Sequence, residues 1–317
     1  MFQSLEEKRI EYFGSLFLKI GRIEMNNSHY DKAVNVSPAV LLPGLLYLIL
    51  FFIIPAFILF RYSLYLNVVG TSKIHGAMTL ENYRSFFTDP YFMKVFWLSL
   101  KISIEVCITD IILAYPLAYY LARSRSRLVP FVSGLNYLPL LASTVVTSFG
   151  WMIILSDTGF LNTFLTSLGI IKTPIKIMYT ELGVVIALIQ STLPFMVVSI
   201  RNVLFMADKF TEDAAATMGA RPYQVFLYVT LPLSFPGIAA GTLLVFVTCM
   251  SSFVTPELIG GGQVPTLATI VLRETQMNLN WSLASTISVI ILVMTVIVIF
   301  SYNRLLESKR LGGGGKS

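Results

Sequence analysis

The chain has 317 residues, of which 55% are hydrophobic and only 13% are charged, whereas soluble domains carry about 25% charged residues. So few polar side chains cannot cover a water-exposed surface, which excludes a soluble domain and indicates an integral membrane protein. The net charge of +6 does not indicate a nucleic-acid partner, because the basic residues gather in short segments between apolar runs, as in multi-pass membrane proteins.

The two ends of the chain are predicted to lie outside the membrane. In residues 1–36, Ile10, Phe13 and Phe17 recur at helical spacing beside basic residues, which is typical of a short amphipathic helix on an anionic membrane surface. A partly ordered polar tail is the other interpretation of this segment. Residues 306–317 end in a run of glycines and are interpreted as a cytoplasmic tail, in part a cloning remnant.

Residues 37–305 contain six apolar stretches, each able to cross the membrane as a helix of ~20 residues. In chain order they cover about 38–60, 95–120, 128–155, 182–205, 235–253 and 283–302. The second contains Lys101, Glu105 and Asp110, and each central charge costs roughly 2.5–3.5 kcal/mol on insertion scales. We retain this span because the distribution of the basic residues places both termini in the cytoplasm, which requires an even number of spans.

Residues 206–233, between the fourth and fifth apolar stretches, form a polar loop with two predicted short helices. The first covers Thr211 to Met218, is rich in alanine and has acids near its start, where they suit the helix dipole. Gly219 is placed to cap this helix in a left-handed conformation. Pro222 is placed to open the second helix, which we expect to end before Leu231-Pro232.

Such a loop is suited to docking on a protein partner. An alanine-rich helix is thin enough to enter a groove, and its acids can pair with a basic rim. Any helix–turn–helix loop can use these residue types, so each element alone is weak evidence. The complete spacing, within a cytoplasmic loop before the penultimate span, favours docking.

The residues from Glu212 to Pro222 resemble the loop by which type I ABC importer permeases dock on their ATPase, with Asp213 where that family usually has glutamate. The resemblance covers about residues 38–305. Further stretches are similar to the spermidine/putrescine permease branch: Leu80-Glu81-Asn82-Tyr83, Gly159-Phe160-Leu161-Asn162, Thr173-Pro174-Ile175, Leu193-Pro194-Phe195-Met196 and Thr255-Pro256-Glu257-Leu258-Ile259-Gly260-Gly261. Residues 262–267 and Asn280-Trp281, before the last span, depart from that branch.

The resemblance implies an all-α permease of the MetI-like fold in the bacterial inner membrane. It implies two copies of an ABC ATPase, a second permease chain and an extracytoplasmic binding protein as partners. ATP and Mg would be bound by the ATPase, and this chain would hold no cofactor and would not be an enzyme. The residues implied to dock on the ATPase are Glu212, Asp213, Ala214, Ala215, Gly219, Ala220, Arg221, Pro222, Leu231 and Pro232.

A path for a polyamine needs acids, carbonyl oxygens and aromatic faces, because a cation over an aromatic ring gains about 0.5–2 kcal/mol. Ionisable groups within a membrane are functional candidates by default. Asp110 has no basic residue at helical spacing, whereas Lys101 lies four residues before Glu105 and is placed to neutralise it. The candidates within the spans are Asp110, Glu105, Tyr115, Tyr119, Trp151, Gln190 and Ser191.

Other interpretations remain open from the sequence. The same importer class could carry another small solute, such as an opine or a phosphonate. An ion-coupled secondary transporter would need an internal repeat with broken helices, and we find no convincing repeat. A membrane-embedded enzyme would need convergent reactive groups, and the sequence has neither a nucleophile motif nor a metal-ligand spacing. Cys107 and Cys249 lie in apolar runs and are expected to be free, buried thiols.

Overall fold

The computed structural model describes residues 38–67, 74–75 and 78–312, and the predicted surface helix before residue 37 lies outside this part. The elements, with η for π-helical turns, are α2 (Pro38–Leu48), η2 (Ile49–Ile53), α3 (Ile54–Ser63), β1 (Leu66–Asn67), β2 (Ile74–His75), α4 (Glu81–Thr88), α5 (Pro90–Arg123), α6 (Val129–Leu141), α7 (Thr144–Leu155), α8 (Phe160–Ser167), α9 (Glu181–Met206), α10 (Lys209–Thr217), α11 (Pro222–Val225), η3 (Phe226–Thr230), α12 (Leu231–Ser251), α13 (Val254–Gly260), α14 (Leu267–Gln276) and α15 (Trp281–Gly312).

The fold is built from helices, as predicted, apart from the short antiparallel pair β1 and β2. Five helical segments of the described residues are long and apolar enough to cross a membrane: Leu42–Ser63, Thr144–Ser167, Glu181–Met206, Pro222–Ser251 and Trp281–Tyr302. The second predicted span corresponds to α5, a single helix of 34 residues that rises about 51 Å at 1.5 Å per residue. It is longer than any of the five and carries Lys101, Glu105 and Asp110 within its length.

The chain divides into two compact units, residues up to Ile58 and residues from Leu59 onward, which are described separately. In the first unit α2 passes through the π-turn η2 into α3, where the Ile54 N–H bonds the Ile49 carbonyl. Pro55 follows directly. Proline has no N–H and its ring crowds the carbonyl four residues earlier, and a wider π-turn relieves that crowding without ending the helix.

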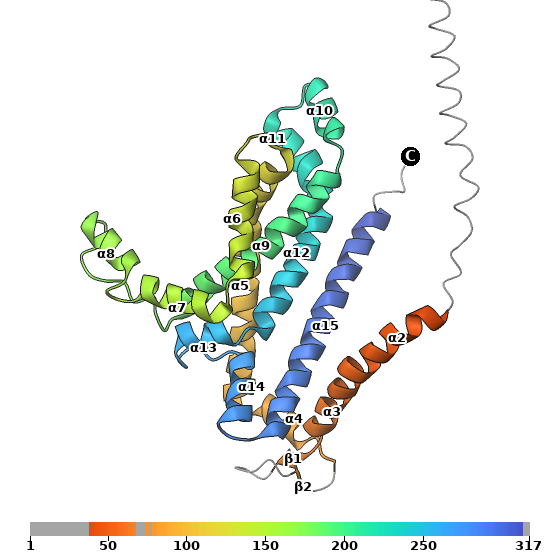
Figure 1. Cartoon of the computed structure of the whole chain (residues 1–317), viewed down its shortest axis with the longest axis vertical. Coiled ribbons are helices and arrows are strands. Elements are labelled where there is room, and N and C mark those ends of the chain that lie inside the picture. Colours follow the sequence, from red (N-terminus) through yellow and green to blue (C-terminus); the bar gives the residue numbers. More distant parts are fainter. Residues whose placement is uncertain (1–37, 68–73, 76–77, 313–317) are drawn as a thin grey trace, which may run out of the picture. The chain divides into compact units, whose positions relative to one another are not determined.

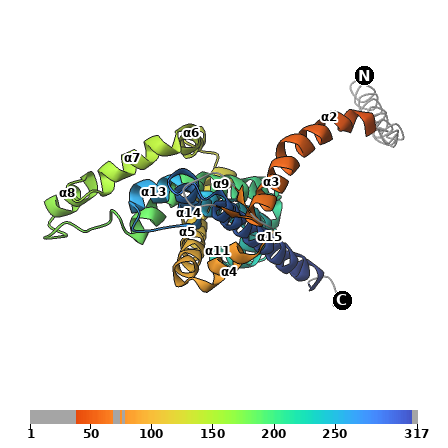
Figure 2. The same ribbon diagram turned by 90° about the horizontal axis from the view of Figure 1, so that it is seen from below.

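In the second unit, the prediction of one span over residues 128–155 is wrong, because this stretch forms two helices. Ala142 and Ser143 both have extended backbone and divide it into α6 and α7. The following residues, from Thr144 to Thr147, are all β-branched, and such residues are weaker helix formers than leucine or alanine. Hydropathy does not detect this break because the residues on both sides of it are apolar. Figure 2 shows α6, α7 and α8 following one another along one side of the unit.

The core of the second unit is the packing of α5, α9 and α12, which run side by side in Figure 1. The buried side chains include Val106 of α5, Leu188 and Met196 of α9, and Val245 of α12. The predicted free, buried state of Cys107 and Cys249 is confirmed.

Two glycines one turn apart let α12 approach α9 closely. A Cβ at Gly237 would lie 2.8 Å from the Ser199 carbonyl oxygen, and a Cβ at Gly241 would lie 2.6 Å from the Met196 sulfur. Membrane helices associate through such small-residue contacts because lipid provides no hydrophobic drive between helices. The small side chains therefore determine how closely the two helices pack.

We expect Gly237→Ala to destabilise the protein by about 1–3 kcal/mol, because the added methyl overpacks the contact with α9. Thermal unfolding of the purified protein in detergent measures this effect. The matched control is Gly134→Ala in α6, where nothing lies within 4 Å of the new Cβ and the better helix propensity of alanine should stabilise by up to ~1 kcal/mol. Equal melting temperatures for the two variants would contradict the assigned contact.

Candidate coupling loop and membrane cavity

The loop of residues 206–233, called here the coupling loop, lies at one end of the bundle and contains α10 and α11 (Figure 1). The Asp208 side chain accepts a hydrogen bond from the Phe210 N–H at 2.9 Å, so the first helix begins at Lys209, earlier than predicted. Gly219 has φ +89° and Pro222 is the first residue of α11. The predicted left-handed glycine cap and the predicted helix start at proline are both confirmed.

The predicted end of the second helix before Leu231-Pro232 is wrong. The chain stays helical from α11 through the π-turn η3 into α12, and the Leu231 N–H bonds the Phe226 carbonyl. The same arrangement occurs before Pro55. In both places a π-turn ends two residues before a proline, and the helix continues through it. One continuous helical segment of 30 residues, Pro222–Ser251, therefore joins the coupling loop to the bundle core.

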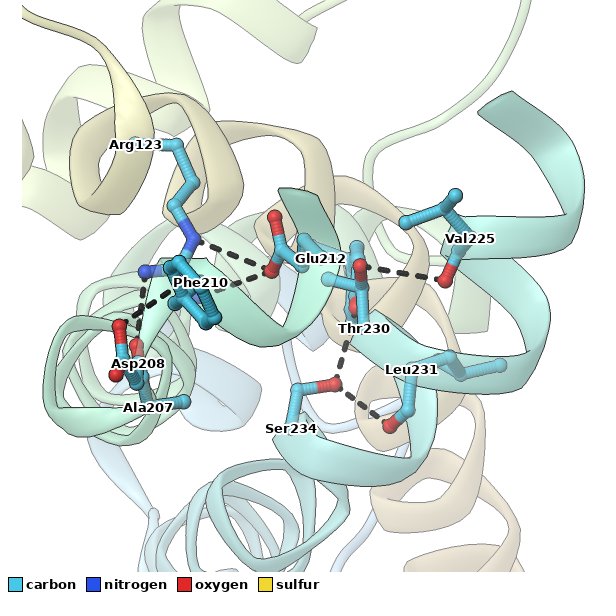
Figure 3. Close-up of polar contacts among 10 residues, drawn as sticks. Arg123, Ala207, Asp208, Phe210, Glu212, Val225, Thr230, Leu231 and Ser234 are labelled. Carbon is cyan, nitrogen blue, oxygen red and sulfur yellow. Dashed lines mark hydrogen bonds and ion pairs between the residues drawn. The ribbon is translucent and has the colours of Figure 1, made fainter. Parts of the chain in front are cut away.

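A buried ion pair fixes the start of the coupling loop (Figure 3). Arg123, the last residue of α5, donates to the Glu212 Oε1 from Nη2 at 2.8 Å and from Nε at 3.2 Å. Its Nη1 donates to the Ala207 carbonyl at 3.0 Å, at the C-terminal cap of α9. The two side chains are 10% and 7% exposed. Contrary to the prediction, Glu212 therefore turns its carboxylate inward, whereas Asp213 is exposed.

The tip of the coupling loop is apolar. Phe210 and Met218 are 74% and 83% exposed, and Tyr223 is also exposed. Sequence reasoning missed these side chains, although large apolar residues within a polar loop were a signal. Of the ten predicted docking residues, the exposed ones are Asp213, Gly219, Arg221, Pro222 and Pro232, the half-buried ones are Ala214, Ala220 and Leu231, and the buried ones are Glu212 and Ala215.

A cavity of about 610 Å³, called here the membrane cavity, is lined by α5, α6, α7 and α9. The predicted candidates Trp151 and Gln190 both line it, and the Trp151 Nε1 donates to the Gln190 Oε1 at 3.2 Å. Thr109 and Asn136 add polar groups that sequence reasoning missed. The remaining lining residues are Leu113, Leu117, Val132, Leu135, Pro139, Ile186, Ile189, Leu193 and Pro194.

The structure places the other predicted pathway residues away from this cavity. Asp110 is fully buried between α5 and α9, where its Oδ2 accepts a hydrogen bond from the Thr192 hydroxyl at 2.7 Å. The Tyr115 hydroxyl lies 3.0 Å from the Ser234 hydroxyl, and the Tyr115 ring meets the Phe226 ring edge-on. The Ser191 hydroxyl donates to its own helix.

Glu105 is neutralised as predicted, since Lys101 Nζ lies 3.6 Å from its carboxylate. The same ammonium is closer to Glu181, at 2.6 Å, and thereby links α5 to the start of α9. Tyr119 is partly exposed and lies four residues before Arg123, on the same face of α5 as Tyr115. Across the described residues, no group of three or more His, Cys, Asp or Glu is placed to hold a metal ion.

Residues 76–310 match the family of binding-protein-dependent transport system inner membrane components. The chain is 32% identical over 266 residues to the spermidine/putrescine transport system permease protein PotB of Haemophilus influenzae, covering 83% of this chain and 92% of that one. It is 31% identical to PotB of Escherichia coli strain K12, covering 83% and 96%. Its fold is similar to a chain of a bacterial alginate ABC transporter solved with a periplasmic protein, with a TM-score of 0.71 at 16% identity, covering 86% and 93%.

We expect Thr192→Val to destabilise the protein by about 1–3 kcal/mol, because it leaves the buried Asp110 carboxyl without its hydroxyl donor. Thr192→Ser keeps the hydroxyl and should cost less. The control is Thr248→Val, since the Thr248 hydroxyl bonds the Leu244 carbonyl of its own helix. If thermal unfolding gives the same loss for Thr192→Val and Thr248→Val, the bond between α5 and α9 contributes nothing to stability.

Proposed function

Because the chain belongs to the family of binding-protein-dependent transport system inner membrane components, we propose that it is the permease subunit of an ATP-driven importer of polyamines, with putrescine and spermidine as substrates. The observation that supports polyamines as the substrate is the match to a spermidine/putrescine permease over 83% of this chain and 92% of the relative. A match of that length covers the cavity walls as well as the coupling loop.

The membrane cavity is mostly apolar, and its walls present one aromatic ring and a few polar groups to a polycation. The Trp151 ring offers a face on which an ammonium group gains about 0.5–2 kcal/mol. Gln190, Asn136 and Thr109 are the polar residues that line the cavity beside the tryptophan, and the Gln190 amide oxygen already accepts from Trp151. The described residues that line the cavity include no charged side chain, so a polyamine would be held by dipoles and a ring.

The proposed assembly contains two copies of an ATPase, a second and different permease chain, and an extracytoplasmic binding protein. The coupling loop would face the cytoplasm and insert its apolar tip into the ATPase, and residues 1–36 and 306–317 would lie on the same side. ATP and Mg would be bound by the ATPase, and this chain would hydrolyse no ATP. ATP binding would draw the ATPases together, move the coupling loop and open the cavity outward to receive substrate.

Uptake into proteoliposomes tests the proposal. The complete complex, with its binding protein, is expected to accumulate labelled putrescine and spermidine only when ATP reaches the ATPase side. ATP hydrolysis stimulated by the binding protein, without uptake of either amine, would retain the importer and reject polyamines as its substrates. If ATP drives neither uptake nor stimulated hydrolysis in the complete complex, the importer itself is rejected.

We expect Met218→Glu to weaken the association with the ATPase at least about tenfold, because it places a charge at the centre of an apolar contact. Co-purification of the ATPase with the permease measures the association. The matched control is Met277→Glu, since Met277 is 73% exposed at the end of α14, away from the coupling loop. Equal recovery of the ATPase with both variants would contradict docking through the tip.

A further inference from the structure

Arg123 joins three helices at one point. Its guanidinium binds the Glu212 carboxylate of α10 and the Ala207 carbonyl at the end of α9, and the residue itself ends α5. The link between α9 and α10 consists of Ala207 and Asp208 alone, and both have extended backbone. The ion pair attaches α10 to α5 independently of this link.

The pair is built for a fixed geometry. Two guanidinium nitrogens share one carboxylate oxygen, and a third bond goes to a backbone carbonyl (Figure 3). Both side chains are nearly excluded from solvent, where an ion pair is stronger and less screened than at a surface. Arginine holds a planar, branched set of donors that a lysine ammonium cannot reproduce.

The other end of this connection is the wall of the membrane cavity. Leu117 of α5 lines the cavity and lies six residues before Arg123, about 9 Å along the helix axis. Tyr115 lies on the face of α5 that includes Arg123, and it contacts Phe226 and Ser234 of the helix that follows α11. The same helix therefore meets both halves of the coupling loop and forms part of the cavity wall.

We propose that the ion pair between Arg123 and Glu212 transmits a movement of the coupling loop to the cavity wall. The pair thereby determines how much substrate is transported for each ATP hydrolysed. This inference rests on the proposed importer function and assigns both groups as positioning residues. When the ATPase displaces α10, the pair pulls the end of α5 with it. Without the pair, α10 pivots at Ala207 and the ATPase motion is absorbed in the loop.

The test uses the complete complex in proteoliposomes and measures putrescine uptake per ATP hydrolysed. Arg123→Met and Glu212→Gln are each expected to lower this ratio at least about tenfold, with the ATPase still bound. The double variant removes both charges and should be no worse than either single variant, because the pair acts as a unit. Arg125→Met is the control, since Arg125 is an exposed arginine two residues away.

A second measurement is independent of the transported solute. Thiol labelling at Leu117→Cys reports the cavity wall, and its rate should change with ATP in the otherwise wild-type complex but not with Arg123→Met or Glu212→Gln. Cys107 and Cys249 are buried and stay in place. Arg123→Lys keeps the charge and should restore only part of the response.

Three results would overturn the inference. The first is an uptake-to-ATP ratio in both single variants equal to that of Arg125→Met. The second is an ATP-dependent labelling change that survives in them. The third is loss of ATPase binding in the charge-free double variant, which would make the pair a purely structural contact. Failure of the proposed function is distinct, because the complex with unaltered Arg123 and Glu212 would then show no response to ATP at all.

Discussion

The close packing of α5, α9 and α12 is the interaction on which the functional regions depend. The membrane cavity takes two of its walls from α5 and α9, and the coupling loop is the connection between α9 and α12. Gly237 and Gly241 leave no room for a side chain between α12 and α9. Because lipid does not press apolar helices together, such fitted contacts determine the spacing of the helices. The cavity and the loop are thus positioned by one set of contacts.

Polar contacts fix α5 against its neighbours at three depths. Lys101 pairs with Glu181 of α9, Asp110 accepts from Thr192 of α9, and Arg123 binds Glu212 of α10. From the sequence alone, the charges of α5 were the main argument against a membrane span. The structure gives Lys101 and Asp110 partners on α9, and Glu105 pairs with Lys101 of its own helix, which offsets the insertion cost of unpaired charges. The span with three charged residues near its middle is thus held to its neighbours by polar contacts along its length.

The sequence predicted those features that depend on local conformation. Gly219 adopts the expected left-handed cap and Pro222 the expected first helical position, because each follows from the backbone preferences of one residue type. The inward turn of Glu212 was not predictable, since its partner lies 89 residues away. Two stretches that resemble the polyamine branch contain residues that stabilise loops. Asn82 donates to the Tyr65 carbonyl at 2.7 Å, and Asn162 donates to the Ile175 carbonyl at 3.0 Å.

The π-turn η3 keeps Pro222–Ser251 as one continuous helical segment. A continuous helix is stiff, so its two ends are mechanically connected. The close contact with α9 at Gly237 and Gly241 is the point about which the segment could turn. The arm from Pro222 to Gly237 measures about 22 Å, and the arm from Gly241 to Ser251 about 15 Å, at 1.5 Å per residue. If the segment turned as a rigid body about that contact, a sideways displacement of its loop end would be reversed at the far end and reduced to about two thirds of its size.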